Sequence, residues 1–586
     1  MARFLRIVAL GGIAIALVAL GLWLEPRQAP DRAAPPAIPP DAGAFVRAEG
    51  RELTRDGAPF RFEAVAFGND YSLALGEYGF SLADSRHHSE RDFERVAGLG
   101  FNAIRFAFNG TWWRDDPHAF WDWLDRNIGW ARAHGLVLVL DLHVPIGGDW
   151  LDASLDPDFS IWTDPAEGAL NVALWRAVAE RYRDEPTIAA YDLLNEPVTA
   201  DATGDQWRQL AAEMVAAIRA VDPNHLLVVG PVYGTERAYR PIGPGDQFLV
   251  DDPNALYDVH FYEPIAFTHQ TAGWLADPIA DGGRYPDPDV LVPTGAQELL
   301  PEARIAGPTL PAGDSDWQRY ESAWTEVTDP RAVAALPTAT LRSGARGQVL
   351  FDDIEVFERD PATGRIRRVL HAPIAETDLG AWWDWSDPDS APARFARVTA
   401  EGVNDDASLL IDGAAGRDGF LGWSSDLDWF RVAPGRSYRI SGFMKGRGVR
   451  YGPAGEAPGH IGLALDVYGG SEAGDPGFLP RGPAYLDHLL GDLTRFGRDH
   501  EVPMSVMEFG TIRATLDDPD KGGARWISDM LDLFGAQGLS FSLWAYHDAA
   551  MGLYLTDPDR RPGRANTALI EAVEAYFARS GARSRP

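Results

Sequence analysis

The stretch AAYDLLNEPV, residues Ala189 to Val198, is an apolar run that ends in Asn195 and Glu196 and is stopped by Pro197. Its apolar side chains are typical of a strand that is buried on both faces, as in a parallel sheet. An amide and a carboxylate at the end of such a strand either face solvent or point into a functional site. The neighbouring segments decide between these two interpretations.

Similar apolar runs alternate with amphipathic helical patterns on both sides of this stretch. The predicted strands are RFEAVAF (61–67), NAIRFAF (102–108), LVLVLDLH (136–143), IAAYDLLNE (188–196), HLLVVG (225–230), ALYDVHFYE (255–263), PMSVMEF (503–509) and LSFSLWAY (539–546). Predicted helices separate most of them, which indicates βα repetition and an α/β fold. Eight such strands predict a (β/α)8 TIM barrel. A doubly wound open sheet is disfavoured because no glycine-rich phosphate-binding turn follows the first strand.

A long segment of different character separates the sixth and seventh predicted strands. Residues 291–480 contain many Gly, Pro and Asp residues and alternating runs such as GQVLFDDIEVFE (347–358). Such runs predict an inserted all-β sandwich between barrel strands 6 and 7. We therefore expect the first part of the barrel over residues 45–290 and its second part over residues 481–580.

The inserted segment resembles the jelly-roll carbohydrate-binding modules found beside many polysaccharide-degrading enzymes. Segments like SDWQRYESAW (315–324) and GQVLFDDIEVF (347–357) come last in those modules but first here, before DWFRVAPGRSYRISGFMKG (428–446). The resemblance implies a circularly permuted sandwich, which requires the 347–358 strand to lie near segment 371–412. It also implies a structural calcium ion as an option at Asp352 and Asp353. Its tryptophans form either a sugar platform or core: Trp317, Trp383, Trp385, Trp423 and Trp429.

The N-terminus predicts export. Arg3 and Arg6 precede an uncharged apolar run, residues 7–24, close to the roughly 20 residues that span a bilayer. We expect residues 1–24 to be a membrane anchor, with a cleaved signal peptide as the alternative, and residues 25–44 to be a Pro/Ala-rich linker. The protein would then face the periplasm from the inner membrane of a bacterial cell envelope, or be secreted. The sequence contains no cysteine, as suits an exported bacterial protein.

Charge and composition disfavour several classes of partner. The formal net charge of −33 argues against nucleic acid and against strongly anionic polymers. Thiolate metal sites are impossible without cysteine. His143 and His260 could bind zinc together with carboxylates, but neither an H-x-H motif after the first strand nor an H-E-x-x-H helix is present. We expect no catalytic metal, no cofactor and a monomer.

Polar residues gather at the carboxyl ends of the predicted strands, where barrel enzymes have their active sites. They are Arg105, His143, Asn195, Glu196, His260, Tyr262, Glu508 and Trp544. Each one alone has a structural interpretation, such as an ion-pair partner, a hydrogen-bonded framework histidine or a core tryptophan. Their coincidence at the same end of six strands favours a catalytic site. Two carboxylates across a barrel mouth, Glu196 and Glu508, suit glycoside hydrolysis.

The motifs NAIRFAF, LDLH, LLNEP, VHFYEP, MEFG and LWAYHD, in this order, resemble glycoside hydrolase family 5 of clan A. The resemblance implies an endo-β-glycanase that acts by retaining double displacement, with Glu196 as acid/base and Glu508 as nucleophile. It further implies that Asn195 binds the sugar 2-hydroxyl and that Trp544 forms the floor under the sugar. The remaining residues would tune the nucleophile or hold the substrate and the acid/base: Arg105, Tyr262, His143 and His260. His269, in FTHQTAGW (267–274), is a weaker candidate.

The implied partner is a β-linked polysaccharide, oligosaccharide or glycoconjugate, and the N-terminal segment implies contact with a membrane. Two alternatives remain open. One is a transglycosylase that uses the same residues and would make longer chains. The other is a non-catalytic carbohydrate-binding envelope protein, which the presence of both carboxylates disfavours.

Overall fold

The computed structural model describes residues 44–71, 82, 88–148, 159–275, 279, 281–295, 297–372, 382–388, 390–399, 401–403, 407–425, 429–452, 458–470 and 477–581. The predicted anchor and all but the last residue of the predicted linker lie outside these residues. Within them, no helix is both long enough and apolar enough to cross a membrane.

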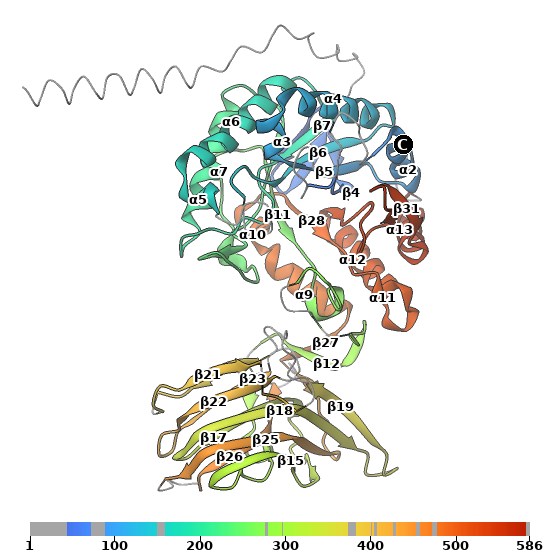
Figure 1. The fold of residues 1–586 in the computed structure, drawn as a ribbon. Helices are drawn as coiled ribbons and strands as arrows, with labels where there is room; N and C mark the ends of the chain where they lie inside the picture. Colours follow the sequence, from blue (N-terminus) through green and yellow to red (C-terminus); the bar gives the residue numbers. More distant parts are fainter. Residues whose placement is uncertain are drawn as a thin grey trace, which may run out of the picture. The chain divides into compact units, whose positions relative to one another are not determined.

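Eight parallel strands close into a barrel, which confirms the predicted TIM barrel and contradicts the open-sheet alternative (Figure 1). The strands are β4 (Glu63–Phe67), β5 (Ala103–Asn109), β6 (Val137–Val144), β7 (Ile188–Asp192), β8 (Leu226–Val229), β11 (Ala255–His260), β28 (Met504–Phe509) and β29 (Ser540–Leu543). They follow one another around the barrel in chain order, and β29 closes it on β4. Nearly every residue of these strands is buried, because the barrel interior and the surrounding helices cover both faces.

Helices surround the barrel, as Figure 1 shows for α2, α4, α6 and α7. They are α2 (Glu90–Leu99), α3 (Gly110–Asp115), α4 (Pro117–Ala133), α5 (Ser160–Thr163), α6 (Pro165–Tyr182), α7 (Asp205–Arg219), α8 (Ile265–Thr268), α9 (Pro483–Leu493), α10 (Arg495–His500), α11 (Ala514–Asp517), α12 (Gly523–Gln537) and α13 (Thr567–Gly581). Helix α4 illustrates the local signals. Asp116 accepts a hydrogen bond from the backbone N–H of Ala119, and Pro117 occupies the first turn.

A three-stranded meander that the sequence analysis did not predict covers the amino-terminal end of the barrel. It consists of β1 (Val46–Glu49), β2 (Glu52–Arg55) and β3 (Ala58–Phe60). Val46 and Leu53 pack in one hydrophobic cluster with residues from the starts of the barrel strands, such as Ala64 and Val137. Because the meander covers this end, a site can open only at the opposite end, where the strands finish and barrel enzymes have their active sites.

Two antiparallel sheets occupy the chain between β11 and β28. The first contains β12 (Asp287–Pro293), β13 (Gln297–Leu299), β14 (Ile305–Ala306), β17 (Ala332–Arg342), β20 (Trp382–Ser386), β23 (Phe420–Ser425), β24 (Phe430–Arg431), β26 (His460–Gly470) and β27 (Phe478–Arg481). The second contains β15 (Gly313–Glu321), β16 (Thr325–Glu326), β18 (Ala345–Arg359), β19 (Ile366–Ala372), β21 (Arg394–Val398), β22 (Ser408–Ala414) and β25 (Ser437–Tyr451). Side chains from both sheets share one hydrophobic cluster, so the two form the expected sandwich.

The strand pairing in the sandwich bears on the predicted permutation. Strand β18 pairs with β19 and with β22, so the 347–358 strand lies beside the 371–412 segment, as a permuted module requires. Permutation itself stays a prediction. Of the tryptophans considered for a sugar platform, Trp423 and Trp429 are buried in hydrophobic clusters, whereas Trp383 is 47% exposed.

Candidate active site

The eight residues proposed from the sequence lie together at the carboxyl end of the barrel. Contacts described below link every one of them into a single network. Arg105, His143, His260 and Glu508 belong to strands, whereas Asn195 and Glu196 follow β7, Tyr262 follows β11 and Trp544 follows β29. The side chains of Arg105, His143, Asn195, Glu196, His260 and Glu508 are all buried. Such a concentration of buried polar groups indicates a site built for chemistry.

Arg105 is the centre of this network. Its guanidinium donates to Glu508 Oε1 at 2.6 Å, to Asp192 Oδ2 at 2.9 Å and to Asn195 Oδ1 at 2.9 Å. It also forms an ion pair with Asp141 Oδ1 at 3.2 Å. Burial opposes its charge, but Asp141, Asp192 and Glu508 together raise the pKa of Arg105 well above its usual value. Arg105 is therefore a fixed cation that holds two candidate site residues in place.

Three buried carboxylates beneath the site were not assigned from the sequence: Asp141, Asp192 and Asp258. For Asp141 and Asp258 a usable signal was present, because each precedes a histidine by two residues, in LDLH (140–143) and in DVH (258–260). Strand alternation places such pairs on one face. Burial raises the pKa of Asp192 to about 7, although Arg105 opposes this shift.

Glu508 has both carboxylate oxygens engaged by donors. Arg105 donates to Oε1, and the hydroxyl group of Tyr262 donates to Oε2 at 2.8 Å. The same Oε2 lies 3.5 Å from Nδ1 of His260. Burial, followed by the charges of Glu508 and Glu196, raises the pKa of Tyr262 well above its usual value, so Tyr262 remains a donor at neutral pH. These contacts fix the orientation of the carboxylate.

Glu196 lies on a backbone that neighbouring segments hold in an unusual conformation. Its φ is 37°, in the left-handed region that non-glycine residues seldom adopt. Asn195 donates its backbone N–H to Leu142, and Pro197 accepts from the backbone of Tyr233. Strained backbone of this kind is concentrated at functional sites. The backbone after β7 therefore departs from strand geometry, and hydrogen bonds to neighbouring segments hold it in that conformation.

His260 connects the two glutamates. Its Nδ1 lies 2.6 Å from Glu196 Oε1, and its Nε2 lies 3.3 Å from Asp258 Oδ2. Burial lowers the pKa of His260, but Glu508, Asp258 and Glu196 outweigh it and raise that pKa well above the usual value. At neutral pH the ring is therefore an imidazolium that donates to acidic groups on both sides.

Aromatic rings form one wall of the site. His143 and Trp544 stack with ring centroids 5.2 Å apart, and Tyr71 lies 4.1 Å from the ring of His143. His143 Nδ1 is 2.7 Å from Asp141 Oδ2, which fixes the ring, and its Nε2 is 3.4 Å from the side-chain nitrogen of Asn195. This wall joins Trp544 to the polar network.

The weaker candidate His269 lies at the edge of the same site. Its ring packs against Tyr262 with centroids 4.9 Å apart and against Trp274 at 5.9 Å. Burial lowers the pKa of His269 to about 4, although Glu508 opposes the shift, so the ring is neutral at physiological pH. Trp274 is 54% exposed, and the sequence analysis did not single it out.

A metal interpretation can be tested on the geometry. Glu196, His260 and Glu508 offer three ligand atoms within 4.8 Å of one another. However, the 2.6 Å between His260 Nδ1 and Glu196 Oε1 is a hydrogen-bond distance. Two ligands on one tetrahedral ion, with bonds of about 2.0 Å, would be about 3.3 Å apart. The spacing fits a shared proton better than a shared ion.

Part of the chain that forms this site matches a known protein family. Residues 64–299 match the protein-family model described as cellulase (glycosyl hydrolase family 5). The match therefore includes strands β4 to β11 and Glu196, and it ends before Glu508.

Two curated relatives and one solved structure illustrate the likeness. Endoglucanase C of Acetivibrio thermocellus is 31% identical over 202 residues, covering 33% of this chain and 55% of the relative. Mannan endo-1,4-beta-mannosidase 2 of Oryza sativa subsp. japonica is 31% identical over 270 residues, covering 37% of this chain and 57% of the relative. A solved cellulose synthase subunit Z from Clostridioides difficile is 12% identical with a TM-score of 0.44, covering 88% of this chain and 99% of that chain.

These comparisons differ in what they support. The chain spans about half the length of the curated relatives it matches. The solved structure has too low a TM-score to support an argument about function. The family match and the curated relatives both point to glycoside hydrolases. The contacts described above show which side chains could take part in such a reaction.

Proposed function

We propose that this chain, whose barrel matches the family model of cellulase (glycosyl hydrolase family 5) over residues 64–299, hydrolyses β-glycosidic bonds by retaining double displacement. The observation that carries the proposal is the position of Glu196 and Glu508, whose nearest carboxylate oxygens lie within 4.8 Å. Retaining enzymes have carboxyl groups about 5–5.5 Å apart, whereas inverting enzymes need about 6.5–9.5 Å to admit a water molecule. The short separation favours retention.

Glu508 is the proposed nucleophile. Donors on both of its oxygens, Arg105 and Tyr262, suit a carboxylate that attacks as an anion and must be aimed at one carbon. In the first step an oxygen of Glu508 forms a bond to the anomeric carbon while the bond from that carbon to the leaving oxygen breaks. Arg105 and Tyr262 stabilise the negative charge again when the carboxylate departs in the second step.

Glu196 is the proposed acid/base. It gives a proton to the leaving oxygen in the first step and takes one from the attacking water in the second, so the cycle leaves it unchanged. His260 engages Oε1 of Glu196, which leaves Oε2 as the oxygen that exchanges the proton with the substrate. The strained backbone at Glu196 supports this role, because it fixes the direction of the side chain.

The remaining predicted residues are proposed to hold the sugar next to the two glutamates. Arg105 donates to the side-chain oxygen of Asn195 and His143 Nε2 contacts its nitrogen, which leaves one amide N–H for a sugar hydroxyl. The ring of Trp544 offers an apolar face on which the C–H groups of a sugar can stack. His143, fixed by Asp141, completes the aromatic wall.

The proposed substrate is a neutral β-linked glucan or mannan. Curated relatives include proteins named endoglucanase, cellodextrinase and mannan endo-1,4-beta-mannosidase, which supports this class without selecting one member. The net charge of −33 agrees with an uncharged polymer. The apolar N-terminal run supports the further proposal that the enzyme acts in a bacterial cell envelope or outside the cell.

The direct test is release of new reducing ends from a panel of β-1,4-glucan, mixed-linkage β-glucan, β-mannan and xylan. We expect the full chain to cleave a glucan or mannan, and Glu508→Gln to lose activity by a factor of at least about 10³. Glu263→Gln provides a matched control, since Glu263 lies near the site but accepts a backbone N–H of its own loop. Equal activity of native protein and Glu508→Gln would overturn the assignment, and longer rather than shorter products would indicate transglycosylation.

A further inference from the structure

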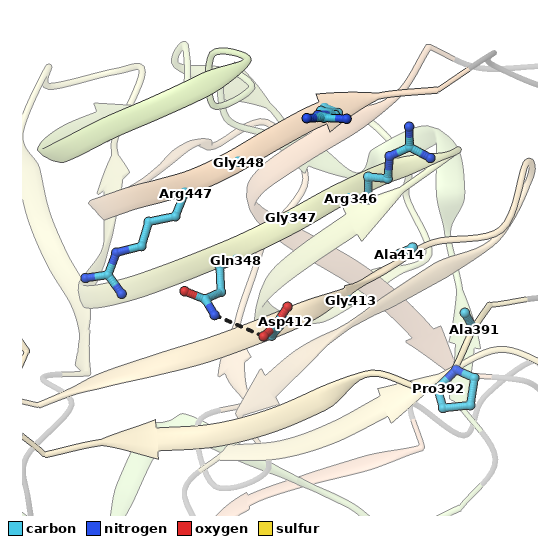
Figure 2. A pocket seen from close by; sticks show the side chains of 11 residues that line it. Arg346, Gly347, Gln348, Ala391, Pro392, Asp412, Gly413, Ala414, Arg447 and Gly448 are labelled. Atoms are coloured by element: carbon cyan, nitrogen blue, oxygen red, sulfur yellow. Dashed lines mark hydrogen bonds between the residues drawn. The ribbon is translucent and has the colours of Figure 1, made fainter.

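The outer face of the second sheet of the sandwich contains a hollow of about 600 Å³ that the proposed hydrolysis does not use. It lies over β18, β22 and β25, and Figure 2 shows Gln348 and Asp412 between Arg447 on one side and Arg346 on the other. We propose that this hollow binds an acidic oligosaccharide, meaning a sugar chain that carries an isolated carboxylate. Binding there does not depend on catalysis in the barrel.

Strand register places five polar side chains on the same face. Gln348 pairs with Asp412 of β22 and with Arg447 of β25, and Arg346 pairs with Arg450 of β25. Paired residues of antiparallel strands project from the same side of a sheet. The neighbouring positions Val349 and Ile411 face the opposite way, into the hydrophobic core of the sandwich.

A β-bulge brings both arginines of β25 to this face. Arg346 and Gln348 are two residues apart, whereas their partners Arg450 and Arg447 are three apart, and the register shifts between them. In a regular strand, residues three apart project from opposite faces. The bulge contains Gly448, whose φ is 60°, and it directs Val449 into the core. The extra residue therefore adds a second cation to the outer face.

Two glycines allow the strands beneath the hollow to pack closely. Gly347 has φ 143°, and a Cβ atom there would lie 3.0 Å from the Cα of Val449. A Cβ atom on Gly413 would lie 2.5 Å from the Cβ of Ala393, in the segment that forms one wall. Both glycines lie on the core side of the sheet, with Val349 and Ile411, so their missing side chains allow close packing of the bulge in β25 and of the segment around Ala393 beneath the arginines.

The charges of the hollow indicate a ligand that is partly anionic. Arg346 and Arg450 are exposed and have no carboxylate partner among the described residues, while Arg447 is paired with Glu401. Two available guanidinium groups suit a carboxylate, which arginine can bind in a bidentate manner.

The side chains of Asp412 and Gln348 favour binding of a sugar over binding of a polyanion. Gln348 donates to Asp412 Oδ2 at 3.0 Å, so the carboxylate lies in the middle of the hollow (Figure 2). A carboxylate there repels nucleic acid or a densely charged polymer but accepts hydrogen bonds from sugar hydroxyl groups. Hydroxyl groups beside one carboxylate are the chemistry of an oligosaccharide with a single acidic substituent.

The test compares two probes that differ in one charged group. Xylotriose and the same trisaccharide bearing one glucuronic acid are titrated calorimetrically into the full chain carrying Glu508→Gln, which prevents cleavage. We expect the acidic probe to bind at least tenfold more tightly than the neutral one. Adding Arg346→Gln and Arg450→Gln should abolish this difference, whereas adding Arg331→Gln, at an exposed arginine already paired with Asp329 and Glu298, should preserve it.

Two outcomes would overturn the proposal: equal affinities of the two probes for the parent protein, or an unchanged preference in the double variant. Because Arg346 and Arg450 are exposed, their replacement should leave the thermal unfolding midpoint unchanged, and that measurement accompanies the titration. The reducing-end assay of the native barrel is independent of both results, so failure here leaves the proposed hydrolysis untouched.

Discussion

Tyr262 illustrates how one hydroxyl group contributes to the proposed chemistry. It donates to Glu508 Oε2, and replacement by phenylalanine removes this bond while keeping the ring that packs against His269. A hydrogen bond to a charged group contributes about 1.5–3 kcal/mol, so Tyr262→Phe should lower kcat/KM by roughly 10- to 150-fold. Steady-state kinetics on the best substrate measure this, and Tyr320→Phe in the sandwich is the control. An unchanged kcat/KM would show that Glu508 does not need this donor.

Asp192 makes the stability of the barrel depend on pH. Its pKa is raised to about 7 in the folded protein, against about 3.9 in an unfolded chain. Between these values the folded state retains a proton that the unfolded state releases. The contribution of Asp192 to the free energy of unfolding should therefore fall as pH rises from about 4 to 7, by up to about 1.4 kcal/mol per pH unit.

The comparison with Asp192→Asn isolates this effect, because asparagine cannot titrate and keeps an oxygen that accepts from Arg105. Urea unfolding of both proteins at several pH values gives the difference in free energy of unfolding. We expect the native protein to lose stability relative to the variant as pH rises from 4 to 7. A constant or opposite difference would contradict the raised pKa.

At the residue scale, the sequence identified the polar groups that gather at the carboxyl end of the barrel but not the carboxylates beneath them. Glu196 follows an apolar strand and Glu508 lies next to the last residue of another, where a polar residue is conspicuous. Asp141 and Asp192 lie inside apolar strands, and nothing in their local pattern says that Arg105 of another strand neutralises them. Such pairing depends on which strands become neighbours, which only the closed barrel determines.

Among the elements, the meander β1 to β3 has a structural role that can be tested. Leu53 is 4% exposed and packs in the cluster that fills the amino-terminal end of the barrel. Leu53→Ala should lower the free energy of unfolding by about 2–5 kcal/mol, the usual cost of emptying such a position. Leu249→Ala, at a leucine that is 49% exposed, is the control and should change it little. Equal effects in urea unfolding would exclude this role for the meander.

The elements that sequence reasoning predicted well are those whose signal is local. Barrel strands are continuous apolar runs because both of their faces are covered. The meander was missed because its strands are only three or four residues long and partly exposed. Helix α9 ends at Leu493 and the chain continues as α10 from Arg495; between them the side chain of Thr494 donates to the carbonyl of Leu490, a break that no helix-stop residue announces in the sequence.

For the whole molecule, we expect activity without a metal ion. The short hydrogen bond between His260 and Glu196 leaves the acid/base engaged with a proton donor. Prolonged dialysis against EDTA should therefore leave kcat/KM for hydrolysis of the glucan or mannan unchanged in the reducing-end assay. Loss of activity that returns with a divalent cation would instead support binding of an ion by Glu196, His260 and Glu508.

The organisation of the whole chain was only partly accessible from the sequence. A change of composition after the sixth strand revealed an insertion, and the structure arranges it as two sheets around one core. The hollow over β18, β22 and β25 was not foreseen, because a bulge at Gly448 brings its arginines together. A bulge shifts strand register, and register is a property of paired strands that one strand alone does not reveal.

The central claim is that Glu196 and Glu508 act together in a retaining mechanism. The stereochemistry of the first product tests it most directly. Proton NMR, recorded within minutes of adding the full chain to the β-linked polymer that it cleaves, distinguishes the two anomers before they equilibrate. We expect the β-anomer to appear first and the α-anomer to follow by mutarotation. Initial release of the α-anomer would contradict it, because inversion needs a water molecule where this site brings two carboxylates together.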